Sequence, residues 1–306
     1  MLTQTQEELS AVESPIRVRD QLITIIIPAY NEEQAIADDL KKIFECMDAT
    51  TYQYEVIVVD DGSTDHTADI VRQFARVRLI QHPLNRGTGA ATNTAVRNAR
   101  GEIIAMTDGD GTYPVQDLPR LLEAMEGCDM VIGARTKEAG TMKVLRTPAK
   151  WFIRTLASYL TETPIPDLNS GLRVFRKALA LKFMHLLPHG HSWVSTITLA
   201  HLADDYLVRF IPIDYYPRKG RSTFKPITDT YNYLLLVIRT VMYFNPIKVL
   251  LPGALLLLIG GAARQVYQFF TVNWHVQSSN VVLVLAGLNI LMIALLADLV
   301  VRRARQ

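Results

Sequence analysis

Two short acidic segments are the parts of this sequence whose residue types and spacing best suit chemistry. Asp108 and Asp110 stand one residue apart, with glycine on either side of Asp110, directly after the apolar run Ile103–Met106. Asp60 and Asp61 end a second apolar run, YEVIVVDD. Carboxylates this close repel each other unless a cation or a solvated turn relieves the repulsion. Mg²⁺ is usually held by one or two carboxylates together with substrate phosphates. A metal-binding turn and a plain surface turn are therefore the two interpretations.

The elements that must position these carboxylates are strands alternating with helices. Short apolar runs, typical of buried strands, are separated by segments with helical spacing, such as residues 32–47. The strand-like runs span residues 22–27, 54–61, 77–82, 102–108 and 129–135. This alternation predicts an α/β fold with a mainly parallel sheet, in which ligands bind beyond the carboxyl ends of the strands. We expect one polar rim there, which favours a ligand site over a surface turn. Its members are Asn31, Glu32, Asp60, Asp61, Asp108, Asp110 and Arg135.

Composition narrows the classes of function. The chain has 306 residues, is 49% hydrophobic and carries a net charge of +2, so its charge does not indicate a nucleic-acid partner. Cys46 and Cys128 lie far apart, with no Cys/His cluster for structural zinc. No G-x-x-x-x-G-K-[ST] loop occurs, and the segment Gly87–Gly89 lacks the third glycine of a dinucleotide loop. Residues 1–21 are polar and lack an apolar core, which indicates a flexible leader and not a signal peptide.

The last sixty residues are far more apolar than the rest of the chain. Pro246–Ala263 and Val281–Val301 each approach the roughly 20 residues that cross a bilayer. We therefore expect two transmembrane helices within residues 246–306; the alternative is a buried helical hairpin of a soluble protein. Basic residues gather at one end of the pair, whereas the connecting segment has a single arginine close to the membrane, and the positive-inside rule then places the N-terminal domain and both termini in the cytoplasm. These residues are Lys248, Arg302, Arg303 and Arg305.

Two further segments combine helical spacing with aromatic and aliphatic residues. Residues 144–160 carry Arg146, Lys150 and Arg154 beside Trp151 and Phe152, and residues 228–245 have Arg239 as their only basic residue. Because membrane-spanning segments follow, we expect both helices to lie on the membrane surface; core helices are the alternative. The predicted organisation is a leader at 1–21, a cytoplasmic domain at 22–227, the surface helix at 228–245 and two spans at 246–306.

Several motifs in order complete the sequence pattern. The segments IIIPAYNEE at 25–33, VVDDGSTD at 58–65, NRGTGAA at 85–91 and TDGDG at 107–111 resemble the successive motifs of family 2 glycosyltransferases. The segments GAR at 133–135, DLNSGLRVF at 167–175 and RKGRS at 218–222 resemble those of the polyprenyl-phosphate sugar synthases. That group includes dolichyl-phosphate mannose synthase and bacterial undecaprenyl-phosphate glycosyltransferases. The resemblance covers residues 22–225, and the absence of a QxxRW sequence argues against the processive synthases.

The resemblance implies a fold, a reaction and a set of site residues. The fold would be the glycosyltransferase A type, with a Rossmann-like, mainly parallel sheet. The reaction would transfer a sugar, with inversion, from a nucleotide-diphosphate sugar to polyprenyl phosphate at the cytoplasmic membrane face, by a membrane-bound tetramer. The residues lining the nucleotide would be Pro28, Ala29, Tyr30, Glu32, Asp60, Asp61 and Asp108. Asp108 and Asp110 would bind Mg²⁺ or Mn²⁺ on the diphosphate, and Asp110 and Asp167 would be the catalytic carboxylates.

The resemblance also implies an acceptor site. Its lipid-phosphate ligands would be Arg135, Arg146, Lys150 and Arg218, and its other members Asn169, Ser170 and Arg173. Some assignments stay open: Asp167 could belong to a plain turn after Pro166, and each arginine could be a surface charge. Two departures from the family pattern concern Arg86, where many relatives have lysine, and the segment HGHSWVSTITLA, where many have an acidic residue. In that segment His189, His191 and Trp193 could contact substrate or be structural.

Two other functions remain compatible with the sequence. One is a family 2 glycosyltransferase that acts on a glycan or a glycolipid. The other is a non-catalytic membrane protein with a degenerate nucleotide site. Retention of both acidic pairs argues against the second of these.

Overall fold

The computed structural model describes residues 17–136, 155–159, 161–190, 192–217, 235, 237–271 and 276–304. The chain divides into two compact units. The first comprises residues 1–144, 166–201 and 206–224, and the second comprises residues 145–165, 202–205 and 225–306.

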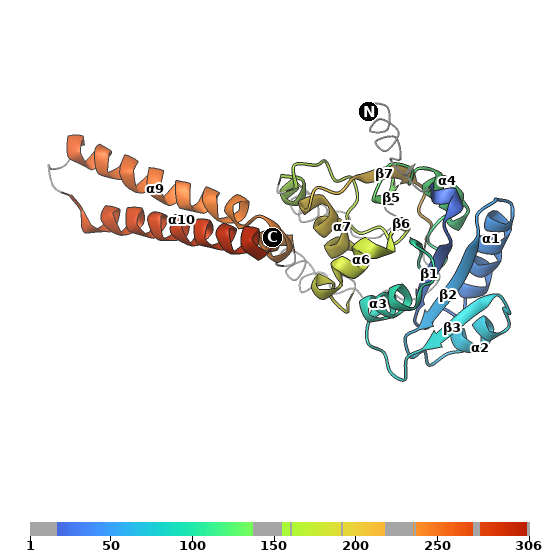
Figure 1. The fold of residues 1–306 in the computed structure, drawn as a ribbon. Coiled ribbons are helices and arrows are strands. Elements are labelled where there is room, and N and C mark those ends of the chain that lie inside the picture. Colours follow the sequence, from blue (N-terminus) through green and yellow to red (C-terminus); the bar gives the residue numbers. More distant parts are fainter. Residues whose placement is uncertain are drawn as a thin grey trace, which may run out of the picture. The chain divides into compact units, whose positions relative to one another are not determined.

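The first unit is built on a seven-stranded sheet with the order β3-β2-β1-β4-β6-β5-β7 (Figure 1). The strands are β1 (Ile23–Ala29), β2 (Tyr54–Asp60), β3 (Val77–Gln81), β4 (Ile103–Met106), β5 (Met130–Arg135), β6 (Arg173–Arg176) and β7 (Val208–Ile213). All pairings are parallel except those of β6 with β4 and β5. This mainly parallel α/β sheet confirms the predicted fold class.

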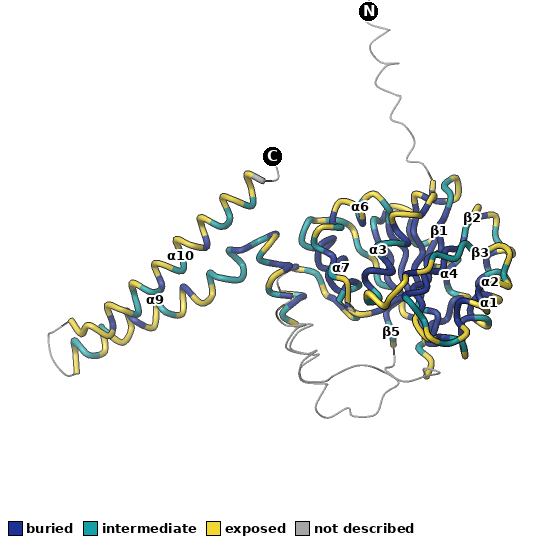
Figure 2. The backbone as a smooth tube through the Cα atoms, turned by 90° about the horizontal axis from the view of Figure 1, so that it is seen from below, coloured by how far each residue is buried: buried dark blue, intermediate teal, exposed yellow. Residues whose placement is uncertain are grey.

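Helices cover both faces of the sheet because alternate strand residues point to opposite sides. Ile25 and Ile27 pack in one core with α1 (Ile36–Asp48) and α4 (Leu118–Glu123), while Ile26 packs in a second core with α3 (Thr88–Asn98) and α7 (Trp193–Ala203). The shorter helices are α2 (Thr67–Arg72) and α6 (Lys177–Lys182), with single 3₁₀ turns at Val18–Asp20, Val115–Asp117 and Met184–Leu186. The central strands β1 and β4 are accordingly buried from end to end, whereas the edge strands β3 and β7 are partly exposed (Figure 2).

Two strands were not expected from the sequence. β6 has four residues and lies antiparallel between β4 and β5, and β7 pairs parallel with β5 at the sheet edge. Because β6 runs the other way, its first residue, Arg173, pairs with Met106 and Ile132 near the carboxyl ends of β4 and β5. The segment that precedes β6 therefore reaches the same rim as the acidic turns.

The second unit contains a helical hairpin of α9 (Pro246–Thr271) and α10 (Ser278–Ala304). Both helices are long and apolar enough to cross a membrane. Their contact is made by small residues, and a Cβ added to Gly287 would lie 2.7 Å from Leu258 Cγ and 2.9 Å from Ala254 O. Outward residues such as Leu256 and Phe270 stay exposed, which fits surroundings of lipid better than burial in a soluble core.

Most of the two predicted membrane-surface helices lies outside the described residues. Within them, residues 155–159 and 237–244 are helical. The membrane-surface assignment of both helices therefore remains a prediction.

The close contact of the hairpin leads to a first prediction. Gly287→Val forces α9 and α10 apart, and overpacking of this kind costs about 1 to 3 kcal/mol. We expect the melting temperature of the detergent-solubilised protein to fall by roughly 3 to 10 °C. Gly260→Val is the matched control, because a Cβ built at Gly260 meets no described residue within 4 Å beyond its chain neighbours and the nearby backbone of its own helix. Equal melting temperatures for the two variants would contradict the close packing.

Candidate functional site

The loops that follow β1 and β2 are joined by side-chain hydrogen bonds. Asn31, with φ at 56°, donates its backbone N–H to Ser63 Oγ at 2.9 Å and accepts the Thr64 N–H on Oδ1 at 2.8 Å. The backbone N–H of Glu32 donates to Thr67 Oγ1 at 2.8 Å. These bonds fix the rim at which Pro28 and Ala29 end β1, and the next residue, Tyr30, is 41% exposed there. An exposed aromatic ring at this edge could stack on a base.

Asp60 and Asp61 are almost completely buried, and both accept hydrogen bonds from neighbouring backbone N–H groups. Asp61 accepts the N–H groups of Arg86 at 3.0 Å and Gly87 at 2.7 Å, so it fixes the loop that begins α3. Asp60 accepts the Ser63 N–H at 3.0 Å. The structure thus places both carboxylates at the rim but engages them with the protein. Their contact with a nucleotide stays a prediction.

His82 is a member of this rim that the sequence analysis missed. Its Nδ1 lies 2.7 Å from Asp61 Oδ1, and its Nε2 lies 2.9 Å from Thr94 Oγ1 on α3. One signal for His82 was present in the sequence. His82 ends the third strand-like run, and the other polar rim residues likewise end or follow strand-like runs.

Asp108 and Asp110 lie on the turn after β4, as predicted. Asp110 is 7% exposed, and its Oδ1 accepts the N–H of Thr112 at 3.1 Å and the hydroxyl of Thr112 at 2.6 Å. The turn bends at Gly111, whose φ is 74°. Gly109 lies so close to α1 that an added Cβ would be 2.6 Å from Ile36 Cδ1. Glycine at position 111 thus suits the left-handed backbone of the turn, and glycine at position 109 leaves room for the Ile36 side chain.

Asp39 is a third carboxylate at this turn and was also missed. It lies on α1, is 2% exposed, and accepts the Gly111 N–H on Oδ2 at 2.9 Å. Burial raises its pKa to about 6, and the negative charge of Asp110 adds to the rise. The sequence could have indicated Asp39 by its position, because it falls on the buried face of α1 with Ile36, Leu40 and Ile43.

Asp39 leads to a second prediction, on stability in the absence of divalent metal. Its folded-state pKa lies above the unfolded value, so folding favours the protonated form, and stability falls as pH rises from about 4 to about 6. Asp39→Asn keeps an acceptor for Gly111 and removes this penalty. We expect the variant to be more stable than the wild type above pH 6, by on the order of 2 kcal/mol, and equal to it near pH 4. Melting curves in chelator at both pH values test this, and a difference that is constant with pH would contradict it.

The acidic turn fits a divalent cation. Asp108 and Asp110 offer hard carboxylate oxygens, and the Asp39 carboxylate lies against the same turn through its hydrogen bond with the Gly111 N–H. Within the described residues, no group of three or more His, Cys, Asp or Glu side chains could hold a metal by itself. A cation here would therefore take its remaining ligands from water or from a substrate, as Mg²⁺ commonly does with phosphates.

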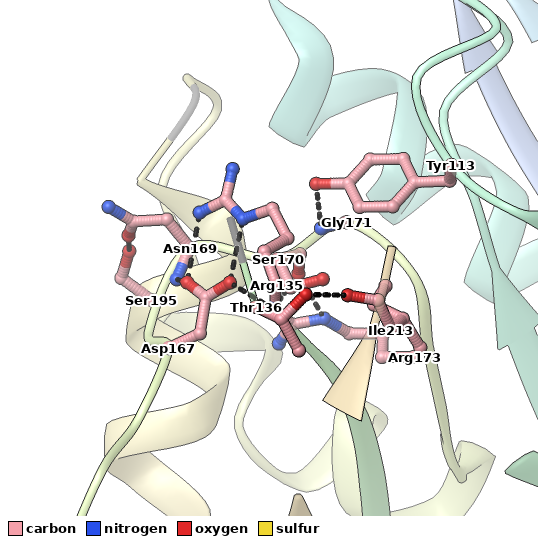
Figure 3. A network of polar contacts seen from close by, with 10 residues as sticks. All are labelled: Tyr113, Arg135, Thr136, Asp167, Asn169, Ser170, Gly171, Arg173, Ser195 and Ile213. Carbon is pink, nitrogen blue, oxygen red and sulfur yellow. Dashed lines mark hydrogen bonds and ion pairs between the residues drawn. The ribbon is translucent and has the colours of Figure 1, made fainter. Parts of the chain in front are cut away.

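Arg135 and Asp167 form a nearly buried ion pair on the other side of the rim (Figure 3). Arg135 Nε donates to Asp167 Oδ2 at 2.6 Å, and Nη2 donates to Oδ1 at 2.9 Å. The backbone N–H of Asn169 donates to the same carboxylate at 3.0 Å. Burial opposes ionisation, but the hydrogen bonds and charge of Arg135 outweigh it, and the pKa of Asp167 lies below its usual range. Asp167 is therefore an oriented anion rather than a base.

The rest of the loop between Asp167 and β6 divides into exposed and buried members. Asn169 is exposed and accepts the Ser195 hydroxyl at 2.6 Å. Ser170 is buried, and its Oγ has no hydrogen-bond partner among the described residues. Arg173 is fully buried and donates to the carbonyls of Ser170 at 3.1 Å and Val194 at 2.8 Å. In this structure Arg173 holds the loop against α7 from within the protein, and its part in shaping an acceptor site stays a prediction.

Three predicted phosphate ligands cannot be placed. Arg146, Lys150 and Arg218 lie outside the described residues, as does His191. Trp193 is described and is a core residue: its Nε1 donates to Asn93 Oδ1 at 2.7 Å, and its ring packs on Phe175. The His189 carbonyl accepts the Ala90 N–H at 3.0 Å, so this segment closes over the start of α3.

The sheet and its rim define an α/β protein with an acidic, cation-compatible turn on one side of the site and an arginine-carboxylate pair on the other. Residues 24–183, about half of the chain, match the model of glycosyl transferase family 2. The chain belongs to this family, and the resemblance seen in the sequence is confirmed. Residues 245–302 match a second model, the GtrB C-terminal hairpin.

The curated relatives are sugar transferases by name. The chain is 31% identical to a dolichyl-phosphate hexose transferase of Haloferax volcanii, over 67% of this chain and 87% of that protein. It is 30% identical to a dolichyl-phosphate beta-glucosyltransferase of Trichomonas vaginalis, over 55% of each chain. It is 30% identical to an undecaprenyl-phosphate 4-deoxy-4-formamido-L-arabinose transferase of Edwardsiella ictaluri, over 54% of this chain and 52% of that protein. The chain thus spans about half the length of the last two.

Solved structures support the fold. Glucosyl-3-phosphoglycerate synthase from Mycobacterium tuberculosis, solved with Mn²⁺, uridine-diphosphate-glucose and phosphoglyceric acid, superposes with a TM-score of 0.58 at 18% identity. The match covers 72% of this chain and 80% of that one. At this identity the likeness concerns the fold alone.

Proposed function

We propose that this protein transfers a sugar from a nucleotide-diphosphate donor to a polyprenyl phosphate, with inversion at the anomeric carbon. The observation that carries the proposal is the arrangement of the rim. The Asp108 turn and the Arg135–Asp167 pair stand at one edge of one sheet, and they come from β4, from β5 and from the segment before β6. Dolichyl and undecaprenyl phosphates in the names of the relatives support the acceptor.

On the donor side, Tyr30 would stack on the base, and Asp60 and Asp61 would hold the loops that surround the nucleotide. Asp108 and Asp110 would hold Mg²⁺ or Mn²⁺. When bound, the cation supplies charge neutralisation for the leaving diphosphate. On the acceptor side, a phosphate monoester is already anionic at neutral pH, so it needs orientation more than a base. Asp167 has the depressed pKa of such a supporting group, and it fixes the plane of Arg135.

The hairpin would place the enzyme in the cytoplasmic membrane as a multi-pass protein. Lys248 at the start of α9 and Arg302 near the end of α10 stand at the same end of an antiparallel pair. The positive-inside rule puts that end, the catalytic domain and both termini in the cytoplasm. A homotetramer is part of the proposal, and the mass of the protein in detergent tests it.

The experiment uses the full chain in detergent, a panel of nucleotide-diphosphate sugars, undecaprenyl or dolichyl phosphate, and Mg²⁺ or Mn²⁺. We expect a lipid-linked sugar of defined mass from at least one donor, and none after addition of chelator. Transfer that requires a glycan or glycolipid and ignores polyprenyl phosphate would overturn the acceptor assignment. Absence of any product across the common donors would count against the whole proposal.

A further inference from the structure

Gly171 joins the donor side of the rim to its acceptor side. A Cβ added to Gly171 would lie 2.6 Å from Asp108 Oδ2 and 3.0 Å from Asp108 Cγ, so the Gly171 backbone lies directly against the Asp108 carboxylate. The N–H of Gly171 donates to the Tyr113 hydroxyl at 2.7 Å (Figure 3). The loop that carries Asp167 is therefore held against the acidic turn by one tyrosine oxygen and by close packing.

Tyr113 is also linked to the same loop indirectly, through Tyr215 and Arg135. Its ring is 6% exposed and lies edge-on to Tyr215, with ring centroids 5.3 Å apart. The guanidinium of Arg135 lies 5.1 Å from the centre of the Tyr215 ring, and Arg135 is paired with Asp167. Tyr113 thus connects the acidic turn, the Arg135–Asp167 pair and Gly171 in one packed ring of contacts.

The electrostatics agree with this geometry. Burial raises the pKa of Tyr113, the charge of Asp108 raises it further, and Arg135 opposes the rise. The hydroxyl therefore stays protonated, and it lies within the electrostatic reach of both sides of the rim. A buried N–H that loses its acceptor costs about 1 to 3 kcal/mol, so loss of this oxygen favours movement of Gly171.

We infer that Tyr113 is a positioning residue, which sets the separation between the donor-side carboxylate Asp108 and the acceptor loop at residues 167–171. The consequence for catalysis rests on the proposed function. In an inverting displacement, the acceptor oxygen and the leaving diphosphate stand on opposite faces of the anomeric carbon. A shift of about 1 Å between the groups that hold them can cost roughly a hundredfold in rate.

Tyr113→Phe in the full chain tests this role, because it removes the oxygen and keeps the ring against Tyr215. We expect kcat for transfer to fall about 10- to 100-fold, while KM for the donor stays within about threefold. Water should replace the misplaced acceptor, so the ratio of donor hydrolysis to transfer rises. Tyr52→Phe is the matched control, because Tyr52 is a buried tyrosine of the same core that precedes the start of β2, whereas the rim lies beyond the carboxyl end of that strand. We expect Tyr52→Phe to leave that ratio unchanged.

Amide hydrogen exchange provides a measurement that needs no acceptor. We expect Mn²⁺ alone to slow exchange in the peptide that covers residues 168–172 of the wild type, and to have a smaller effect in Tyr113→Phe. Equal Mn²⁺ responses in the two proteins, or an unchanged ratio of hydrolysis to transfer, would overturn the role of Tyr113. A wild type that makes no lipid-linked sugar would overturn the proposed function alone, since the exchange experiment still decides about Tyr113.

Discussion

Asp110→Asn is expected to reduce sugar transfer about 10² to 10³-fold, which corresponds to roughly 3 to 4 kcal/mol of transition-state stabilisation. Asparagine keeps an oxygen that can accept the two hydrogen bonds from Thr112, so the turn is retained. What is lost is one negative charge at the place where we propose a divalent cation. The Mn²⁺ concentration for half-maximal rate should therefore rise, which kinetics over a Mn²⁺ series measure.

Stability separates this effect from a general loss of structure. The charge of Asp110 disfavours the ionised form of Asp39, and the substitution relieves that repulsion. Without metal, Asp110→Asn should therefore melt no lower than the wild type at neutral pH. Asp117→Asn is the control, because Asp117 lies on the 3₁₀ turn after the acidic turn, with its side chain paired to Arg120 at 4.0 Å. Unchanged turnover and unchanged metal dependence in Asp110→Asn would rule out Asp110 as a metal ligand.

The sequence predicted the donor half of the rim well for a physical reason. Each of its acidic residues follows an apolar strand directly, and parallel strands bring their carboxyl ends to one edge. Once the strands were recognised, the position at the rim could be predicted for Asp60, Asp61, Asp108 and Asp110. Asp39 could not be found in this way because it stands in the first turn of α1 and not directly after a strand. Only its position on the buried face of α1 marks it as unusual.

The acceptor half depended on contacts between residues distant in sequence. Asp167 and Arg135 are 32 residues apart, and Gly171 and Tyr113 are 58 apart. Their proximity follows from the antiparallel insertion of β6 between β4 and β5, and a strand of four residues gives little periodic signal. Arg173 shows the same limit. A motif can indicate that an arginine matters, but only the packing shows that its guanidinium points into the protein.

The hairpin illustrates a different case. Length and hydropathy predicted both helices, because a continuous apolar segment needs no distant partner to be recognised. The contact between the helices was not predicted, since it depends on which small residues face each other. Gly287 meets Leu258 and Ala254 because of the way each helix is rotated about its own axis, and the hydropathy of a segment does not give this rotation.

Removal of either partner of the Arg135–Asp167 pair is expected to destabilise the protein strongly. The two side chains are 14% and 10% exposed, so each single variant leaves a charge with little solvent. Losing one partner of a buried pair costs about 3 to 5 kcal/mol, or roughly 6 to 15 °C in melting temperature for a domain of this size. Asp167→Leu and Arg135→Met should both show this, and the double variant should be more stable than either single variant, because it leaves no unpaired buried charge.

The pH dependence of the same variants has a definite sign. The pKa of Asp167 is depressed in the folded state, so its contribution to stability is present above the unfolded value near 3.9 and is lost as pH falls through the folded pKa. The advantage of the wild type over Asp167→Leu should therefore be full at pH 7 and shrink below about pH 4. Melting curves across this range measure it, and a constant advantage would contradict the ion pair as its source.

Activity separates the two roles that this pair could have. If the pair only stabilises the domain, the double variant, which regains stability, should regain transfer. If Asp167 orients Arg135 toward the acceptor phosphate, as we propose, all three variants should lose transfer at least 100-fold. Donor hydrolysis should persist in the double variant, because the acidic turn and its carboxylates are untouched. Recovered transfer in the double variant would mean that the pair is only structural. Other cationic residues would then have to bind the acceptor phosphate.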